Sequence, residues 1–183
     1  MIVKLIEKPS EADWLAVKRR AMVTVGKDAK TPPTLEWKHR ILEARHSPIR
    51  RLHFSFYFEG IPYWVAMHLR THVHDCPNGD EFTLYVKSQR DDRQNEYPRG
   101  KAPQDQPVNL IIDMSAEQLM TLANKRLCMT VALETRKIVK AMCALVEVEF
   151  PEFKGLLVPM CQYHGGVCHE MFPCGALDNS KKK

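Results

Sequence analysis

The clearest structural pattern in the chain is Leu52-His53-Phe54-Ser55-Phe56-Tyr57-Phe58-Glu59. Its leucine and its three phenylalanines alternate with more polar residues, and this period of two predicts a β-strand with one face in the core. We expect Gly60 to end the strand, and Pro62 to lie in the first turn of a helix that runs to about Thr71. The fold prediction therefore starts from a strand that is followed at once by a helix.

Similar patterns on both sides of this strand predict the other elements. Further strands are expected at residues 2–6, 82–86 and 108–112, with a polar loop at 91–107. Helices are expected from Ser10 to Met22, from Thr34 to about Ser47-Pro48, and from Thr130 to Glu149. Another helix is expected to begin at the capping box formed by residues Ser115 to Gln118 and to continue through Leu119 and Leu122. This order predicts an α+β fold with a small antiparallel or mixed sheet flanked by helices.

Length and composition favour one globular unit. The chain has 183 residues, 44% hydrophobic and 27% charged, so we expect a packed core. We assign residues 1–158 to a single domain and residues 159–183 to a Cys/His-rich loop with a basic tail. No apolar run reaches the roughly 18 residues of a membrane span, and the first residues lack signal-peptide architecture. A cytoplasmic location with reduced cysteines is expected.

The formal charge of +5 depends largely on one end of the chain. Lys181, Lys182 and Lys183 supply three of those charges, and without them 24 basic residues face 22 acidic ones. The remaining charge of +2 does not predict a duplex-binding surface. It is compatible with a pocket for a small anion.

Three arginines lie at the ends of expected elements. Ser88-Gln89-Arg90 follows a strand, where a hydroxyl, backbone N–H groups and a guanidinium could together hold a phosphate. Arg70 follows an apolar helix face, and Arg126 lies between two expected helices. Each could be an ordinary solvated residue, but together they could converge on one anionic ligand.

The order of these features resembles the flavin-dependent thymidylate synthases over roughly residues 10–150. The matching features are the Ser47-Pro48 turn, the strand Phe54-Ser55-Phe56, Arg70-Thr71-His72, the loop Ser88-Gln89-Arg90, Arg126 and Glu134-Thr135-Arg136. Thr71 and His72 replace a His and a second Arg of the family motif. Arg51 stands in the place of a flavin-binding His, with His53 nearby. The nucleotide side of the motif set is thus better preserved than the flavin side.

The resemblance implies a function and a set of roles. Ser88, Gln89 and Arg90 would hold the phosphate and sugar of dUMP, and Arg126 would contact the uracil ring. Arg70 would lie near both uracil and flavin, and Thr71, His72, Arg51 and His53 would face the flavin. FAD would supply a hydride and methylenetetrahydrofolate the carbon, NADPH would re-reduce the flavin, and no cysteine would be catalytic. The family is tetrameric, with sites built between subunits.

The six cysteines divide into two groups. Cys128 and Cys143 lie in helical patterns, whereas Cys76, Cys161, Cys168 and Cys174 lie in loops that look inserted relative to the family. These four could form one thiolate site, with His74, His164 or His169 as substitute ligands, for zinc or an iron–sulfur cluster. The alternative is unligated thiols with surface histidines, since the chain has no Cys-x-x-Cys.

The sequence is compatible with three functions. The first is a flavin-dependent enzyme that transfers a one-carbon unit to C5 of dUMP or a related pyrimidine nucleotide. The second is a non-catalytic homologue that binds a pyrimidine nucleotide or a metal. The third is a module for RNA or single strands, built from Arg50, Arg51, Arg90, Arg93 and Arg99 with Phe54, Tyr57 and Tyr85. Half of those aromatics belong to the expected core, which disfavours nucleic acid as a partner.

Overall fold

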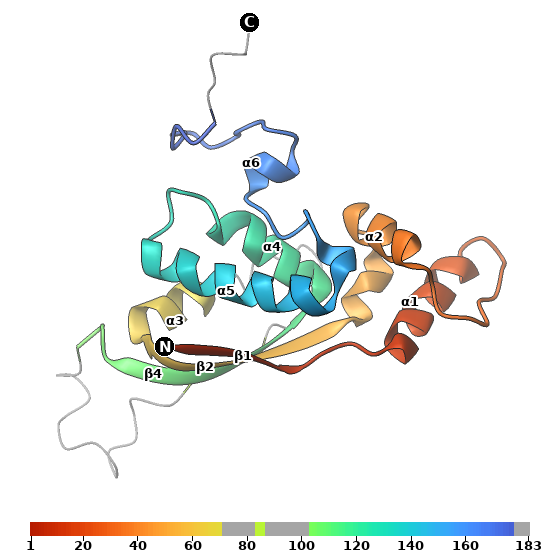
Figure 1. Cartoon of the computed structure of the whole chain (residues 1–183), viewed down its shortest axis with the longest axis horizontal. Helices are drawn as coiled ribbons and strands as arrows, with labels where there is room; N and C mark the ends of the chain where they lie inside the picture. The colour runs from red at the N-terminus through yellow and green to blue at the C-terminus, as the bar shows by residue number, and fades with distance from the viewer. Residues whose placement is uncertain (71–82, 87–102, 178–183) are drawn as a thin grey trace, which may run out of the picture.

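A four-stranded antiparallel sheet with strand order β1-β2-β4-β3 underlies the domain. The computed structural model describes residues 1–70, 83–86 and 103–177. The strands are β1 (Ile2–Glu7), β2 (His53–Pro62), β3 (Thr83–Val86) and β4 (Pro107–Ser115). Helices α4 (Ala116–Arg126) and α5 (Leu133–Glu149) cover one face of this sheet, and α3 (Tyr63–Arg70) lies near one end of it (Figure 1). The α+β prediction is confirmed.

The phenylalanines of β2 form the centre of the core. Phe54, Phe56 and Phe58 are fully buried, as the period of two predicted. They pair with buried residues of β4, so that Phe56 lies opposite Ile112 and Phe58 opposite Leu110. Because Phe54 is buried, it offers no face to a nucleic-acid base.

The end of β2 differs from the prediction. The strand does not stop at Gly60 but passes through a bulge between Phe58 and Ile61 and ends at Pro62. Gly60 has a φ of +67°, and its N–H donates to the side-chain oxygen of Asn109 on β4 at 3.0 Å. Glycine tolerates this backbone conformation, and the bulge allows the pairing between β2 and β4 to continue beyond it. The helix therefore begins after Pro62 instead of containing it.

The first helices follow their predicted caps. They are α1 (Glu11–Val23), α2 (Leu35–Glu43) and the 3-10 turn η1 (Ser47–Arg51). Ser10 and Thr34 cap α1 and α2, and Ser115 forms a capping box with Gln118 at the start of α4. These side chains satisfy backbone N–H groups that have no partner within the helix.

Two predicted boundaries near the C-terminal half are wrong. α5 begins at Leu133, three residues later than expected, because the chain makes a turn in which the Val131 N–H donates to the carbonyl of Cys128 at 3.1 Å. The tail expected as a loop contains a helical turn, α6 (Met160–Tyr163), after the short η4 (Pro151–Phe153). Cys128 therefore lies in the α4–α5 turn and not in a helix.

A buried lysine ties α1 and α2 to the domain. The Lys38 ammonium pairs with Glu11, lies 3.9 Å from a carboxylate oxygen of Glu152, and sits 5.1 Å from the centre of the Trp14 ring. Glu152 is itself buried, and the Lys38 ammonium compensates the negative charge of its carboxylate in the core.

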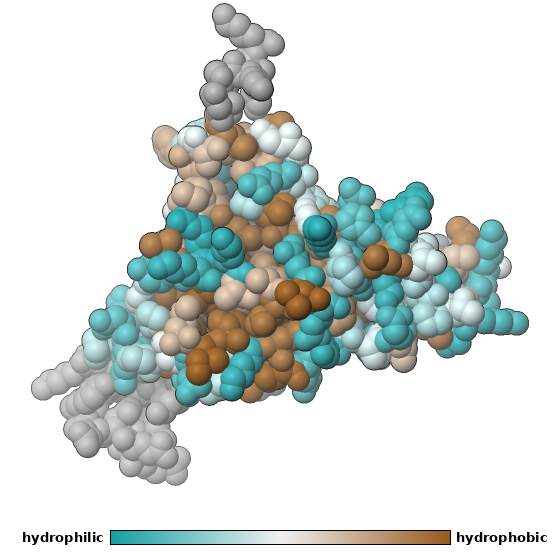
Figure 2. All heavy atoms as spheres, in the orientation of Figure 1, coloured by the Kyte–Doolittle hydropathy of each residue, from teal (hydrophilic) through white to brown (hydrophobic). Residues whose placement is uncertain are grey.

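The face shown in Figure 2 has apolar surface around α5 and β1 and a more polar surface over α1 and α2. Ile2, Ile6, Leu133 and Val148 are exposed, with Val148 at 84%. None of the helices in the described ranges is both long and apolar enough to cross a bilayer.

Candidate functional site

The C-terminal ends of α3 and α4 meet through Arg126. This residue ends α4, is half-buried, and donates from Nη2 to the backbone carbonyl of His68 at 3.1 Å. Arg70 ends α3 two residues beyond His68 and is exposed. The two arginines that the sequence singled out as catalytic thus lie at neighbouring helix ends. Helix C-termini favour cations, which stabilises both positions.

The start of α5 completes this group. The hydroxyl of the buried Thr135 lies 3.4 Å from His68 Nδ1, and the ring of Trp64 meets the His68 ring edge-on at 5.4 Å. Arg136 donates to the carbonyl of Met129 at 3.2 Å in the α4–α5 turn. We define the arginine cluster as Arg70, Arg126 and Arg136. These arginines lie on α3, α4 and α5, at or next to the residues that make these contacts. A guanidinium group suits an anionic ligand.

Several predicted site residues lie outside the described residues. They are Thr71, His72, His74, Cys76, Ser88, Gln89 and Arg90. The last residue of β3, Val86, pairs with Leu110, which also pairs with Phe58 towards the end of β2 that leads into α3. Ser88 is two residues further along the chain from this point. The roles assigned to these residues stay predictions.

Arg51 and His53 lie away from the arginine cluster within one chain. Both are exposed, and His53 pairs with Ser115, the N-cap of α4. Arg126 is at the opposite end of that eleven-residue helix, and a helix of this length spans roughly 16 Å. The predicted flavin residues Arg51 and His53 are therefore separated from Arg126 by the length of α4.

The neighbour of Arg51 and His53 is Asp13 on α1. Hydrogen bonds from Ser10 hold the pKa of the Asp13 carboxyl below its usual value, and the charges of Arg51 and His53 add to this effect. Arg51 and His53 thus lie near an acidic group that belongs to the capping box of α1.

A buried amide anchors the tail to α4. Asn124 is fully buried, and its side-chain nitrogen donates to the carbonyls of Leu156 at 3.4 Å and Val158 at 2.7 Å. Its side-chain oxygen accepts from Arg45, whose guanidinium lies 4.8 Å from the centre of the Tyr163 ring. The Tyr163 hydroxyl donates to the carbonyl of Glu43 at 2.8 Å. The tail is thus fixed as far as α6.

Replacing Asn124 by alanine is expected to loosen this attachment by about 1–3 kcal/mol, because two buried carbonyls lose their donor. The measurement is limited trypsin cleavage after Lys154, an exposed residue at the start of the tail, followed by mass spectrometry. The variant should lose its tail faster than the parent chain. Asn109→Ala is the matched control, since the Asn109 side chain accepts from the Gly60 N–H within the sheet and does not contact the tail carbonyls that Asn124 holds. Equal cleavage rates in all three proteins would contradict the anchoring role.

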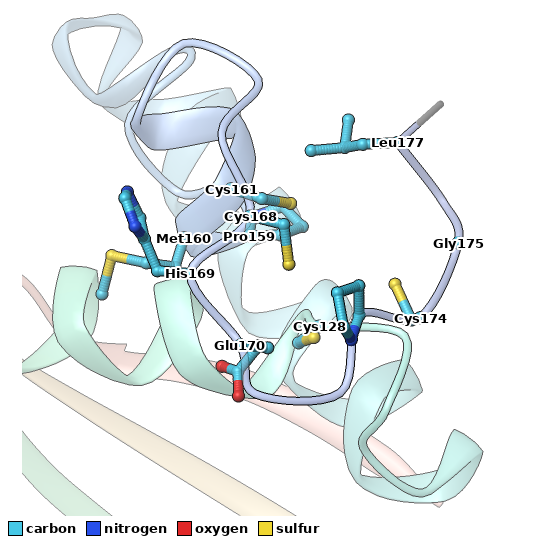
Figure 3. A pocket seen from close by; sticks show the side chains of 11 residues that line it. Cys128, Pro159, Met160, Cys161, Cys168, His169, Glu170, Cys174, Gly175 and Leu177 are labelled. Atoms are coloured by element: carbon cyan, nitrogen blue, oxygen red, sulfur yellow. The ribbon is translucent and has the colours of Figure 1, made fainter. Parts of the chain in front are cut away.

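The tail and the α4–α5 turn enclose a small pocket of about 80 Å³ (Figure 3). Its lining includes four cysteines from separate places in the chain: Cys128, Cys161, Cys168 and Cys174. We name these the thiol group. His169 and Glu170 also line the pocket. Three members match the sequence prediction, and the fourth is Cys128 in place of Cys76, which lies outside the described residues.

Sequence reasoning missed Cys128 because its surroundings have no glycine or proline and look helical. The useful signal was its position in the short gap between two expected helices. Cys128 Sγ accepts a hydrogen bond from the Thr130 hydroxyl at 3.2 Å. His164 stacks edge-on against His169 with ring centres 5.3 Å apart. As the side chains stand, no three His, Cys, Asp or Glu residues in the described ranges form a ready coordination sphere.

The thiols differ in their ionisation. Burial raises the pKa of Cys161, and the nearby Cys168 and Cys128 raise it further, so these three sulfurs are close enough to interact. Burial raises the pKa of Cys143 in α5 to about 12, which keeps this thiol protonated and inert. Cys143 is therefore a core residue, as its helical pattern predicted.

A larger and more open hollow of about 710 Å³ lies between the end of α1 and α2. Its lining includes Trp37, Arg40, His46 and Pro48. None of the arginine cluster lines it.

Comparisons of sequence and of structure give different results. No protein-family model matches the chain, and no curated protein is similar to it in sequence. One solved structure, thymidylate synthase X (ThyX) from Helicobacter pylori with FAD and dUMP, superposes with a TM-score of 0.66 at 15% identity, over 86% of this chain and 99% of that one. The chain has the fold of a flavin-dependent thymidylate synthase.

A second structure of the same Helicobacter pylori enzyme, also complexed with FAD and dUMP, agrees. It has a TM-score of 0.64 at 15% identity and covers 81% of this chain and 95% of that one. The resemblance inferred from the ordered motifs is thus confirmed for the fold. At 15% identity the likeness shows the fold alone.

Proposed function

We propose that this protein is a flavin-dependent thymidylate synthase-like enzyme that transfers a one-carbon unit to C5 of dUMP or a related pyrimidine nucleotide. The observation that carries the proposal is the contact of Arg126 with the carbonyl of His68, which joins Arg126 to the helix end that bears Arg70. Structures with the same fold were obtained with FAD and dUMP. The resemblance assigns these two arginines to the pyrimidine ring.

The chemistry of the arginine cluster fits the nucleotide. A half-buried guanidinium can donate to a uracil carbonyl and stabilise the negative charge that develops on the ring when C6 accepts a hydride. Arg126 would do this, and Arg70 would orient the ring from the neighbouring helix end. Ser88, Gln89 and Arg90 would hold the phosphate and the sugar. Catalysis would depend on positioning and charge, without a protein nucleophile.

The cofactor side needs more than one copy of the chain. Bound reduced FAD would supply the hydride, with methylenetetrahydrofolate as carbon donor and NADPH as the source of reducing equivalents. Arg70, Thr71 and His72 would face the flavin from one side. Arg51 and His53 lie at the other end of α4, so we propose that a second copy brings them to the same flavin in a homo-oligomer, a tetramer by resemblance. The exposed Ile2, Leu133 and Val148 supply apolar area for such contacts.

Two measurements on the purified chain test the proposal. The absorption spectrum and mass spectrometry of co-purifying ligands should show a flavin. Tritium should be released from C5-labelled dUMP when methylenetetrahydrofolate and NADPH are added, because the carbon that joins C5 replaces its hydrogen. Omission of either co-substrate is the control and should abolish release.

The alternatives give other results. If the protein is colourless, releases no tritium and has a melting temperature that rises with dUMP, it is a non-catalytic nucleotide-binding homologue and not an enzyme. Binding of an oligonucleotide with a steep dependence on salt would favour a single-strand-binding module instead.

A further inference from the structure

The thiol group brings together sulfurs from segments that are distant in sequence. Cys128 comes from the α4–α5 turn, Cys161 from α6, and Cys168 and Cys174 from the chain that follows. Their side chains point into the space between the turn and the tail (Figure 3). None of them is needed by the proposed chemistry at the arginine cluster. Free cysteines gathered around one small cavity are the donor set of a structural metal site.

The part of the tail after α6, which carries Cys168 and Cys174, has little else to hold it. Within the described residues, none from 167 to 177 has a backbone–backbone hydrogen bond. The large apolar side chains of this segment, Met171 and Phe172, are 86% and 80% exposed and so add nothing to the core. A segment without a core or a hydrogen-bond ladder is commonly held in place by a cross-link such as a bound metal.

We propose that Cys128, Cys161, Cys168 and Cys174 bind one Zn²⁺ ion as four thiolate ligands. Zinc accepts a tetrahedral set of four cysteine sulfurs, and it requires no oxidant. Each thiol gives up its proton to solvent on binding, so four protons leave per ion bound. Zinc with four thiolates carries a net charge of −2, and Cys128 is next in the chain to Met129, whose carbonyl accepts from Arg136.

The backbone near these residues allows the sulfurs to close on the ion. In the structure the four cysteines line the pocket without forming a coordination sphere, so binding must bring their sulfur atoms closer together. Gly165, Gly166 and Gly175 have φ values of +66°, +89° and +75°, and they stand close in sequence to Cys168 and Cys174. Glycine gives the chain the freedom to adjust at these points.

The bound ion would also steady the predicted nucleotide site. Cys128 is two residues beyond Arg126, in the same turn that leads into Thr135 and Arg136. A zinc ion that joins this turn to the tail therefore fixes the chain on which the arginine cluster depends. This structural role leaves the reacting atoms to other residues.

Zinc analysis of the full chain with single substitutions tests the proposal. The chain, purified with a reductant and equilibrated with zinc, is expected to hold about one ion, and Cys→Ser at each member of the thiol group should reduce this to less than about a tenth. Cys76→Ser and Cys143→Ala are the matched controls and should keep the ion. Cys76→Ser is decisive, because it separates the set in the structure from the set that sequence spacing suggested. Full zinc in Cys128→Ser, or its loss in Cys76→Ser, would overturn the assignment.

Spectroscopy on the unaltered chain gives a second readout that does not depend on the folding of variants. Replacement of zinc by Co²⁺ should produce the thiolate-to-cobalt charge-transfer bands and visible bands of a tetrahedral thiolate site. Titration with a mercurial reagent should release one zinc per chain, and the release should be complete only when the four thiols of the thiol group have reacted. An iron–sulfur chromophore, no bound metal, or a mass lowered by the hydrogens lost in disulfide formation would each overturn the zinc site.

Discussion

Replacing Arg126 by alanine is expected to slow tritium release from C5-labelled dUMP by about 10²- to 10³-fold, the usual cost of removing one donor that stabilises a developing negative charge. Arg126 is suited to this role because it is half-buried, where a cation interacts more strongly than in open water. The measurement is the initial rate of release with saturating co-substrates.

Two further variants separate the chemistry from the architecture. Arg126→Lys keeps a positive charge but loses the planar fork, so it should recover only part of the rate. Arg20→Ala removes an exposed arginine on α1 that donates to the Ala16 carbonyl of its own helix, and it should leave the rate unchanged. Because Arg126 also donates to the carbonyl of His68, the melting temperature of each variant is measured in parallel. An unchanged rate in a folded Arg126→Ala protein would refute the assigned role.

Replacing Phe54 by alanine is expected to lower the free energy of unfolding by about 3–5 kcal/mol, the range for loss of a buried aromatic ring. Phe54 is fully buried, and its ring meets the rings of Phe150 and Phe153 edge-on at 5.5 and 5.6 Å. The substitution therefore leaves a cavity where β2 packs against the chain that follows α5. Urea denaturation followed by far-UV circular dichroism measures the loss.

The matched control for this substitution is Phe172→Ala. Phe172 is 80% exposed, so its removal should change the free energy of unfolding by no more than about 0.5 kcal/mol. Equal losses for the two variants would show that the β2 ring is not the centre of the core.

Much of the fold was predictable because its signals are local. The alternation in β2 and the caps at Ser10, Thr34 and Ser115 each depend on side chains within a few residues of the backbone groups that they satisfy. The predicted end of β2 was wrong because a contact with a residue on another strand outweighed the local signal. Gly60 usually signals a strand end, but here the side chain of Asn109 supports a bulge that lets the strand continue.

The candidate sites were predictable only in part, for the same reason. The arginines stand out by their positions at the ends of elements, and an ordered set of motifs connected them to a known family. Their separation along α4 from Arg51 and His53 became visible only when the register between His53 and Ser115 was known. Spacing in the sequence gives no measure of such distances.

The cysteines show the limit most clearly. Their residue type and their positions in loops indicated a metal-binding or unligated thiol group of four members, Cys76, Cys161, Cys168 and Cys174. That Cys128 lines the same pocket depends on how α6 packs against α4, which Asn124, Arg45 and Tyr163 determine through contacts between residues far apart in the chain. Helices, strands and caps arise from neighbours in sequence, whereas the membership of a site arises from packing, and that is why Cys128 entered the group only once the tertiary structure was known.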